Sequence, residues 1–352
     1  MKNSNRVLWL DIVRATAIIS VIVCHVTEAV YPLNMEFMSQ TNWHTKLMAF
    51  TLFTFGRLGV PFFLFATGYL LLDRSYGRAG TWRFWKKNLL RLFITVEVWI
   101  VVYHFFLHWL KGSEIRITVL FKNMLFLKNV EMSHMWYIPM ILGMYIFLPF
   151  VADSLQHIDF EILKLPISIV CVYLFVLPVM NVVCLAFGRN AGTNLLSLDY
   201  GGGIYGLYFI MGYLLKKGIL KRFHIWQLAF GGISGFFGVV GIQLFSYGRG
   251  NAYNVWYNNI FLLLGSMMFF EMISRLRIQK NCWIWDSLSK YSFGIYLLHN
   301  MVLLILRVYV AQTGKPEIKF ILFLSVTLLT SWLTAAGISR IPGIGKQLLY
   351  IK

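Results

Sequence analysis

Ten apolar stretches separated by short polar segments run through this chain of 352 residues. Most are about 18–25 residues long, which is the length that an α-helix needs to cross the hydrocarbon core of a bilayer. The pattern therefore predicts an all-α integral membrane protein with about ten transmembrane helices. Their approximate positions are residues 7–30, 46–72, 89–110, 135–152, 164–186, 201–216, 224–246, 257–274, 291–311 and 318–338.

Composition and charge agree with this topology. Hydrophobic residues make up 58% of the chain and charged residues 13%, against about 45–50% and 25% in soluble domains. A net charge of +18 would suggest nucleic acid as the partner of a soluble protein, but here the distribution of the charge explains it better, and we expect no nucleic acid. With an even number of spans, most bases fall on the side of the N-terminus, so the positive-inside rule predicts that both termini are cytoplasmic. These bases are Lys2, Arg6, Arg74, Arg78, Arg83, Lys86, Lys87, Lys216, Lys217, Lys221, Arg222, Arg275, Arg277, Lys280, Arg340 and Lys346.

Nothing in the sequence divides the chain, and we expect a single transmembrane domain over residues 1–352. The first apolar stretch is interrupted by Asp11 and Arg14 and is followed by no small-residue cleavage site, so we do not expect a cleaved signal peptide. The four cysteines show no metal-ligand spacing and are interpreted as small core residues, which leaves no metal site. They are Cys24, Cys171, Cys184 and Cys282.

Two ionisable residues inside the first stretch, Arg14 and His25, are the first candidates for chemistry, because such residues are costly within a membrane. Their eleven-position separation corresponds to about 1,100° of helical rotation, which is within about 20° of the same face. It also corresponds to about 16 Å along the axis, or half the hydrocarbon thickness. One helix face therefore carries a cation near one side of the bilayer and an imidazole deep inside it.

Each of these residues has a carboxylate neighbour. Glu28 lies one turn beyond His25 and can orient the imidazole as a general base, although His25 can also be a packing residue. Asp11 lies three residues before Arg14, so the two form either a structural ion pair or part of an anion-binding site. Residue chemistry alone leaves both alternatives open.

Other segments carry weaker signals. Gly59 and Gly68 permit close helix packing, and Pro61 can break or bend the helix. A basic, aromatic-rich stretch from Trp82 to Arg91 anchors the chain at the membrane edge and can also bind phosphates. Polar or ionisable residues recur in later stretches at Glu97, His134 and His299.

Taken together, these segments resemble the acyltransferase-3 family of bacterial membrane O-acyltransferases over nearly the whole chain. Length and the lack of further domains are similar to the subgroup that contains the O-acetyltransferase of enterobacterial common antigen. The resemblance rests on Asp11, Arg14 and His25, on Pro61-Phe62-Phe63 with Thr67-Gly68-Tyr69, on the basic stretch ending at Arg91, on His134-Met135-Trp136-Tyr137, and on Tyr291-Ser292-Phe293-Gly294-Ile295-Tyr296-Leu297-Leu298-His299.

The resemblance implies ten core helices in the bacterial inner membrane and transfer of an acyl group, usually acetyl from cytoplasmic acetyl-CoA, to a hydroxyl of a glycan or lipid-linked saccharide. It makes His25 the catalytic base and Arg14 the organiser of the CoA site, with Glu28 and Asp11 supporting them. Where the family often has Arg-x-x-Arg, this chain has Asn88-Leu89-Leu90-Arg91. The expected CoA-binding residues are Arg14, Lys86, Lys87, Arg91 and Ser292, and the expected acceptor-binding residues are His134, Trp136, Tyr137 and His299.

Two rivals remain at this stage. A transporter of a small molecule or glycan also carries intramembrane ionisable residues, but it would not bind CoA. A purely structural subunit of an envelope-synthesis complex would tolerate loss of both Arg14 and His25. Membrane lipid is a partner under every interpretation, and a homo-oligomer is compatible with the sequence.

Overall fold

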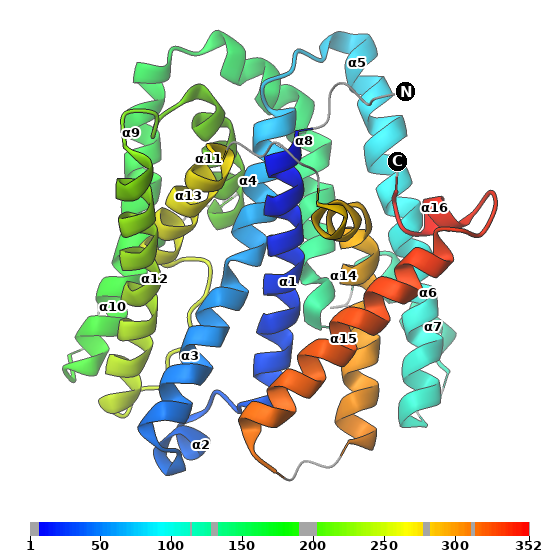
Figure 1. The fold of residues 1–352 in the computed structure, drawn as a ribbon. Coiled ribbons are helices and arrows are strands. Elements are labelled where there is room, and N and C mark those ends of the chain that lie inside the picture. The colour runs from blue at the N-terminus through cyan, green and yellow to red at the C-terminus, as the bar shows by residue number, and fades with distance from the viewer. Residues whose placement is uncertain are drawn as a thin grey trace. The chain divides into compact units, whose positions relative to one another are not determined.

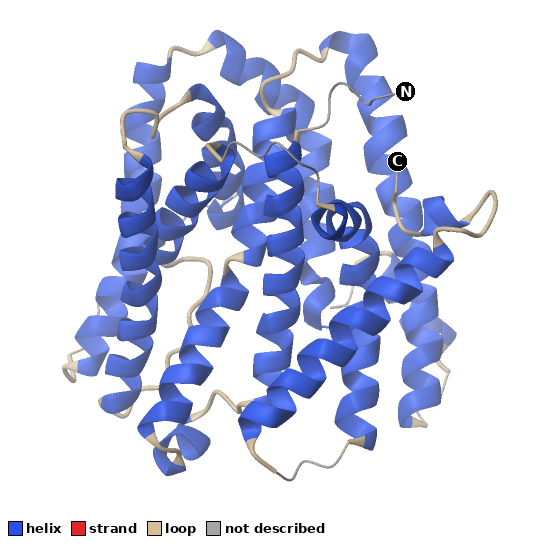
Figure 2. Cartoon of the chain, viewed as in Figure 1, coloured by secondary structure: helices blue, strands red, loops and turns tan. Residues whose placement is uncertain are grey.

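The computed structural model describes residues 7–112, 115–127, 133–189, 203–276, 282–310 and 314–351, and its regular structure within these ranges is helical (Figures 1 and 2). Eight helical segments in these ranges are long and apolar enough to cross a membrane. The all-α integral membrane class is therefore confirmed. Four of the bases used for the topology, Lys2, Arg6, Arg277 and Lys280, lie outside the described residues.

The described residues contain eight candidate spans, where the sequence predicts about ten. Each of the ten predicted stretches is largely helical, but α11 (Gly203–Lys217) and α13 (Ile260–Ser274) have only 15 described residues each. At 1.5 Å per residue such a helix is about 22 Å long, which is shorter than a hydrocarbon core of about 30 Å. Eight candidate spans, rather than ten, are therefore found among the described residues.

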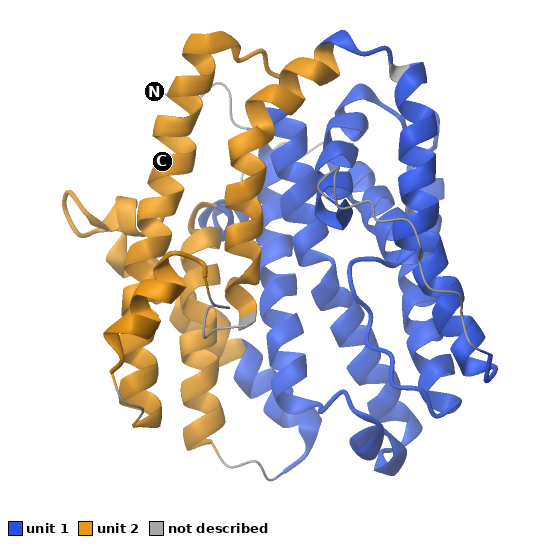
Figure 3. Cartoon of the chain, turned by 180° about the vertical axis from the view of Figure 1, so that it is seen from behind, with its two compact units in different colours: residues 1–73, 157–289, 314–324 blue, residues 74–156, 290–313, 325–352 orange. Residues whose placement is uncertain are grey.

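The chain forms two compact units, which are interleaved in sequence (Figure 3). The first comprises residues 1–73, 157–289 and 314–324, and the second comprises residues 74–156, 290–313 and 325–352. Two long helices, α14 (Trp283–Tyr309) and α15 (Pro316–Ile338), contribute to both.

The first unit is built around α1 (Leu8–Val30), which packs against α3 (Trp43–Arg57), α4 (Gly59–Leu71) and α13. Of the eight candidate spans, α1 is the most enclosed, since 72% of its apolar window is buried against 67% or less in the others. In addition, α4 packs against α11, and α12 (Ile225–Gly248) packs against α3 and α13. The remaining helices of this unit are α2 (Met35–Gln40), α9 (Phe160–Cys171), the π-helix η3 (Val172–Val176) and α10 (Leu177–Ala186).

Glycines allow the helices of the first unit to approach closely. A Cβ atom on Gly56 would lie 2.5 Å from Cα of Cys24, and one on Gly59 would lie 2.7 Å from the carbonyl oxygen of Ala17. A Cβ atom on Gly68 would overlap the carbonyl oxygen of Phe209 in α11. The predicted packing role of Gly59 and Gly68 is therefore confirmed.

The second predicted stretch is interrupted between Arg57, where α3 ends, and Gly59, where α4 begins. Pro61 explains the position of this break. Its ring nitrogen has no hydrogen to donate to the carbonyl of Arg57, four residues earlier, and the ring would collide with that carbonyl in a continuous helix. The predicted effect of Pro61 is thus confirmed, with the break three residues before the proline.

The second unit begins with α5 (Gly77–Phe84), which leads through the π-helix η1 (Trp85–Leu89) into α6 (Leu90–Lys111). Gly112 ends α6 in the left-handed conformation, with φ of 64°, which glycine adopts without strain. This unit also contains α7 (Ile117–Met124), the 3₁₀ turn η2 (Ser133–Trp136), α8 (Tyr137–His157) and the short α16 (Gly345–Leu348), which packs against α6 (Figure 1).

Candidate functional site

His25 and Glu28 are joined by a hydrogen bond on α1. Nδ1 of His25 lies 2.9 Å from Oε2 of Glu28, as their three-residue spacing predicts. The imidazole donates to the carboxylate from Nδ1, so the lone pair of the neutral ring lies on Nε2. This is the arrangement in which an imidazole accepts a proton from a substrate hydroxyl.

Arg57 is a third member of this group. Its Nη2 atom lies 3.5 Å from Oε1 of Glu28, so the carboxylate connects the imidazole of α1 to the guanidinium at the end of α3. The Arg57 side chain is only 8% exposed, whereas that of Glu28 is 38% exposed. A buried guanidinium of this kind stabilises the ionised carboxylate and fixes its position.

Aromatic rings hold the Arg57 guanidinium in place. Its Cζ atom lies 4.5 Å from the ring centroids of both Phe53 and Trp256 and 5.4 Å from that of Tyr257. Nη1 also donates to the hydroxyl of Tyr257 at 3.5 Å, and the Tyr257 carbonyl in turn accepts a hydrogen bond from Tyr208. These cation–π contacts of a desolvated arginine hold the guanidinium in a fixed position.

Arg57 is not among the site residues predicted from the sequence, although the sequence carries a signal for it. It is the only charged residue between positions 47 and 72, and a charge inside an apolar span is by default a candidate functional residue. The pairing of Arg57 with Glu28, 29 positions earlier, depends on tertiary packing and could not be found from local spacing.

Asp11 and Arg14 occupy the first turns of α1. Asp11 is 5% exposed and its Oδ1 atom accepts a hydrogen bond of 2.7 Å from the Ser289 hydroxyl at the start of α14. Arg14 is half-buried. The structure thus gives Asp11 a buried hydroxyl partner that sequence spacing did not suggest.

His134 lies in a buried hydrogen-bonded cluster of the second unit. Its Nδ1 atom is 2.7 Å from Nδ2 of Asn300, and its Nε2 atom is 3.4 Å from the hydroxyl of Tyr103. The Asn300 amide donates to Nδ1, so Nε2 carries the hydrogen and points it at Tyr103, whose own hydroxyl donates to the carbonyl of Leu297. The ring is therefore held as a neutral tautomer between α6 and α14.

The other expected acceptor-binding residues surround this cluster. His299 is fully buried and its Nδ1 atom lies 2.6 Å from the Tyr296 carbonyl, while its ring centroid is 5.2 Å from that of His134. The ring of Tyr137 lies 6.1 Å from those of both Trp136 and Tyr296. The structure thus brings His134, His299 and Tyr137 together, and their predicted binding of the acceptor stays a prediction.

The expected CoA-binding residues of the second unit lie on helices, not on a loop. Lys86 and Lys87 belong to the π-helix η1, and Arg91 follows in the first turn of α6. The Arg91 guanidinium donates from Nη2 to the carbonyls of Lys346, at 3.2 Å, and Ile351, at 2.6 Å. Ser292 is buried in α14.

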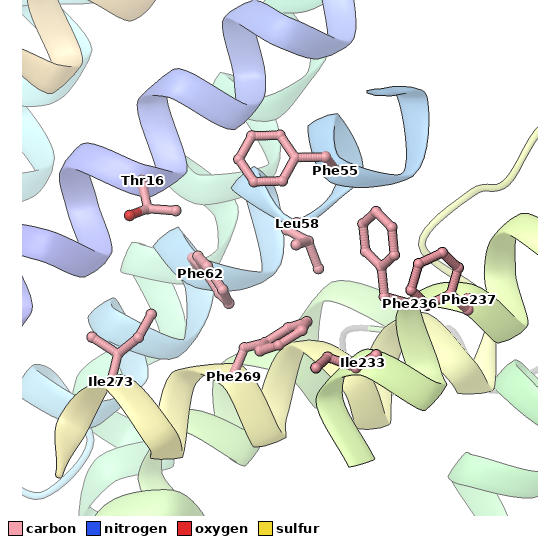
Figure 4. A pocket seen from close by; sticks show the side chains of 9 residues that line it. All are labelled: Thr16, Phe55, Leu58, Phe62, Ile233, Phe236, Phe237, Phe269 and Ile273. Carbon is pink, nitrogen blue, oxygen red and sulfur yellow. The ribbon is translucent and has the colours of Figure 1, made fainter. Parts of the chain in front are cut away.

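An apolar cavity of about 300 Å³ lies in the first unit between α1, α3, α4, α12 and α13 (Figure 4). Thr16 is the only one of its lining residues with a polar side chain, so the cavity suits hydrocarbon and not a phosphate or a sugar. Thr16 and His25 are nine positions apart, or about 180° around α1, which separates this cavity from the His25 face. The lining residues are Thr16, Phe55, Leu58, Phe62, Ile233, Phe236, Phe237, Phe269 and Ile273.

Comparison with known proteins identifies the family. A family model described as an acyltransferase domain matches residues 7–336, which is nearly the whole chain. The chain belongs to the acyltransferase-3 family. No curated protein and no solved structure matches it. Membership makes the chain a membrane acyltransferase and confirms the resemblance at the level of the family.

Within this acyltransferase, the predicted site residues fall into two groups. Asp11, Arg14, His25 and Glu28 belong to the first unit, where Arg57 joins them. The second unit contains all the others, which are Lys86, Lys87, Arg91, His134, Trp136, Tyr137, Ser292 and His299. The four residues predicted to be catalytic therefore lie within the first unit, and their role stays a prediction.

Proposed function

We propose that this protein is a transmembrane O-acyltransferase that moves an acetyl group from cytoplasmic acetyl-CoA to a hydroxyl of a cell-surface glycan or its lipid-linked precursor. The single observation that carries the proposal is the connected set His25–Glu28–Arg57, in which a carboxylate and a buried guanidinium orient an imidazole. We further propose a bacterial inner-membrane location and a relationship to the subgroup that acetylates enterobacterial common antigen.

In this mechanism His25 is the general base. Its Nε2 atom takes the proton from the acceptor hydroxyl as the oxygen attacks the carbonyl carbon of the thioester. The C–S bond breaks as the tetrahedral intermediate collapses, and the leaving thiolate takes the proton back from the imidazolium. Glu28 keeps the proton on Nδ1 throughout and stabilises the imidazolium, as an orienting carboxylate does in other acyl-transfer enzymes.

Arg14 and the basic residues Lys86, Lys87 and Arg91 supply the charge for the phosphates of CoA. Guanidinium groups bind phosphate through two parallel hydrogen bonds. The positive-inside rule places these residues on the cytoplasmic side, where the donor is found. Acetyl-CoA is too highly charged to cross the bilayer, so only its thioester end needs to reach the depth of His25.

The direct test is acetyl transfer by His25→Ala, assayed with labelled acetyl-CoA in membranes. We expect transfer to be abolished while the amount of protein is unchanged. His44→Ala is the matched control, because His44 is an exposed histidine at the start of α3, and it should retain full activity. Near-normal transfer by His25→Ala would refute the assignment of the base.

A second test addresses the donor site. Arg14→Lys keeps the positive charge but replaces the planar fork with a point charge. We expect weaker binding of acetyl-CoA to the purified variant, measured by isothermal titration. Unchanged affinity would remove Arg14 from the donor site, and a wild-type protein that binds no CoA at all would favour a transporter.

A further inference from the structure

A cavity of about 440 Å³ lies in the second unit between the start of α6 and the C-terminal segment 339–351. It is lined by three cationic residues, Arg91, Arg340 and Lys346, together with Ser339 and Gln347. Among the described residues that line it, none is acidic. A cavity of this size with only positive charge on its walls favours an anionic ligand.

The C-terminal segment is held firmly onto α6. In addition to the two carbonyls bound by Arg91, the Gln347 carbonyl accepts from Thr95 at 3.0 Å and the Leu348 carbonyl from Trp99 at 2.8 Å. The hydroxyl of Tyr350 donates to the Asn88 carbonyl at 3.1 Å. Three successive turns of α6 thus fix the backbone of the segment, so the positions from which its cations extend are also fixed.

The two cations of the segment are not used in this anchoring. Arg340 and Lys346 are exposed, and it is the backbone carbonyl of Lys346, not its ammonium group, that Arg91 binds. Both lie beyond residue 336, where the match to the family model ends. These two cations therefore add positive charge beyond the part of the chain that the family model matches.

We propose that this cavity binds phosphate groups of the acyl-CoA donor, with Arg340 and Lys346 as further cationic ligands beside Arg91 and the Ser339 hydroxyl and Gln347 amide as neutral donors. This inference rests on the proposed function and names a docking site for its donor. The chemistry is that of phosphate esters, which arginine and lysine bind through charge-assisted hydrogen bonds. Anionic phospholipid headgroups carry the same chemistry, so the test must separate the two sources.

The experiment measures binding of adenosine 3′,5′-bisphosphate, the phosphorylated nucleoside end of CoA, to the full-length protein in phosphatidylcholine nanodiscs. The test variant is Arg340→Gln/Lys346→Gln. Its matched control is Lys111→Gln/Lys122→Gln, which removes two exposed cations from α6 and α7 of the same unit. We expect the test variant to bind at least about tenfold more weakly and the control to bind like the wild type.

Three outcomes would overturn the proposal. In the first, the test variant binds the bisphosphate as tightly as the wild type. In the second, both double variants lose affinity equally, which would indicate a general charge effect. In the third, the nucleotide does not bind, and the test variant instead loses enrichment of phosphatidylglycerol from mixed nanodiscs, which would assign the cavity to a lipid headgroup. This proposal can be tested separately from the acyl-transfer proposal, because His25→Ala should bind the bisphosphate like the wild type. If the wild type shows no transferase activity but its bisphosphate binding depends on Arg340 and Lys346, only the proposed function is refuted.

Discussion

Nη2 of Arg57 lies 3.5 Å from Oε1 of Glu28 and ties the end of α3 to the later turns of α1. The other carboxylate oxygen of Glu28 binds Nδ1 of His25, so the position of the imidazole depends on a residue that never touches it. Because Pro61 ends α3 at Arg57, the guanidinium sits at a helix C-terminus, where a cation is favoured. The break between α3 and α4 therefore helps to position His25, the candidate base.

Arg57→Gln is expected to lower the rate of acetyl transfer by about a hundredfold, because small displacements of a catalytic group have effects of that size. Arg57 acts through Glu28 and is a positioning residue, so the affinity for acetyl-CoA should remain close to that of the wild type. Arg57→Lys should recover part of the rate, since the ammonium restores the charge but not the planar contact with the rings. The measurement is kcat together with the Kd for acetyl-CoA.

The control for Arg57 is Arg249→Gln, which removes another arginine of the first unit that lies over aromatic rings, at 5.5 Å from Phe187 and 5.7 Å from Phe245. It is exposed and should leave kcat unchanged. Equal losses in the two variants, or a loss in Arg57→Gln that appears only as reduced protein yield, would contradict the positioning role.

Close packing of α1 on α3 provides a second prediction. Gly56→Ala places a methyl group 2.5 Å from Cα of Cys24, the residue before His25. The helices must separate, and we expect a loss of about 1–3 kcal/mol in stability, as for other overpacked sites, with a loss of activity. Thermal unfolding in detergent and acetyl transfer measure the two effects.

Gly241→Ala is the matched substitution, because a Cβ atom at this position in α12 has no neighbour within 4 Å. Alanine is the better helix former, so the melting temperature should stay the same or rise slightly. If Gly56→Ala behaves like Gly241→Ala, the contact between α1 and α3 is looser than the structure indicates.

The sequence was sufficient for features that depend on local spacing. Apolar length predicted the helices, and the i, i+3 relation of His25 and Glu28 predicted their hydrogen bond. It was insufficient where partners are far apart along the chain, as for Arg57 with Glu28, Asp11 with Ser289 and His134 with Asn300. Apolar length alone also does not separate a full span from a shorter apolar helix such as α13, which has 15 residues.

Asp73 gives a pH-dependent prediction. Its carboxylate, at the end of α4, lies 2.7 Å from Nζ of Lys217 and 3.1 Å from Nζ of Lys216. The hydrogen bond from Lys217, with support from Lys216, lowers the pKa of Asp73 below its usual value near 3.8. A carboxyl group whose pKa is lower in the folded than in the unfolded protein stabilises the fold at pH values above its unfolded-state pKa. This stabilisation is lost as the pH falls through its folded-state pKa.

Asp73→Asn should therefore be less stable than the wild type at pH 7, by about 0.5–1 kcal/mol for a partly exposed ion pair, and the difference should be smaller at an acidic pH below the lowered pKa of Asp73. Thermal unfolding at both pH values measures it. Glu161→Gln, which removes a well-exposed partner of Lys164, should change little at either pH. A difference for Asp73→Asn that persists in acid would mean that the carboxylate acts through something other than its charge.

His134 separates a structural from an acceptor-binding role in the second unit. The ring is 2% exposed, and both of its nitrogens lie near partners, Asn300 at 2.7 Å and Tyr103 at 3.4 Å. Asn300→Leu removes the donor to Nδ1 and leaves a buried acceptor unsatisfied, which costs about 1–3 kcal/mol. We expect the melting temperature to fall and, if His134 acts only in the fold, the KM for the acceptor to stay constant in the protein that remains folded. Asn300→Asp, assayed beside it, accepts instead of donating and should favour the other tautomer of His134. A rise in acceptor KM in both variants, measured on the protein that remains folded, would instead place His134 in the acceptor site.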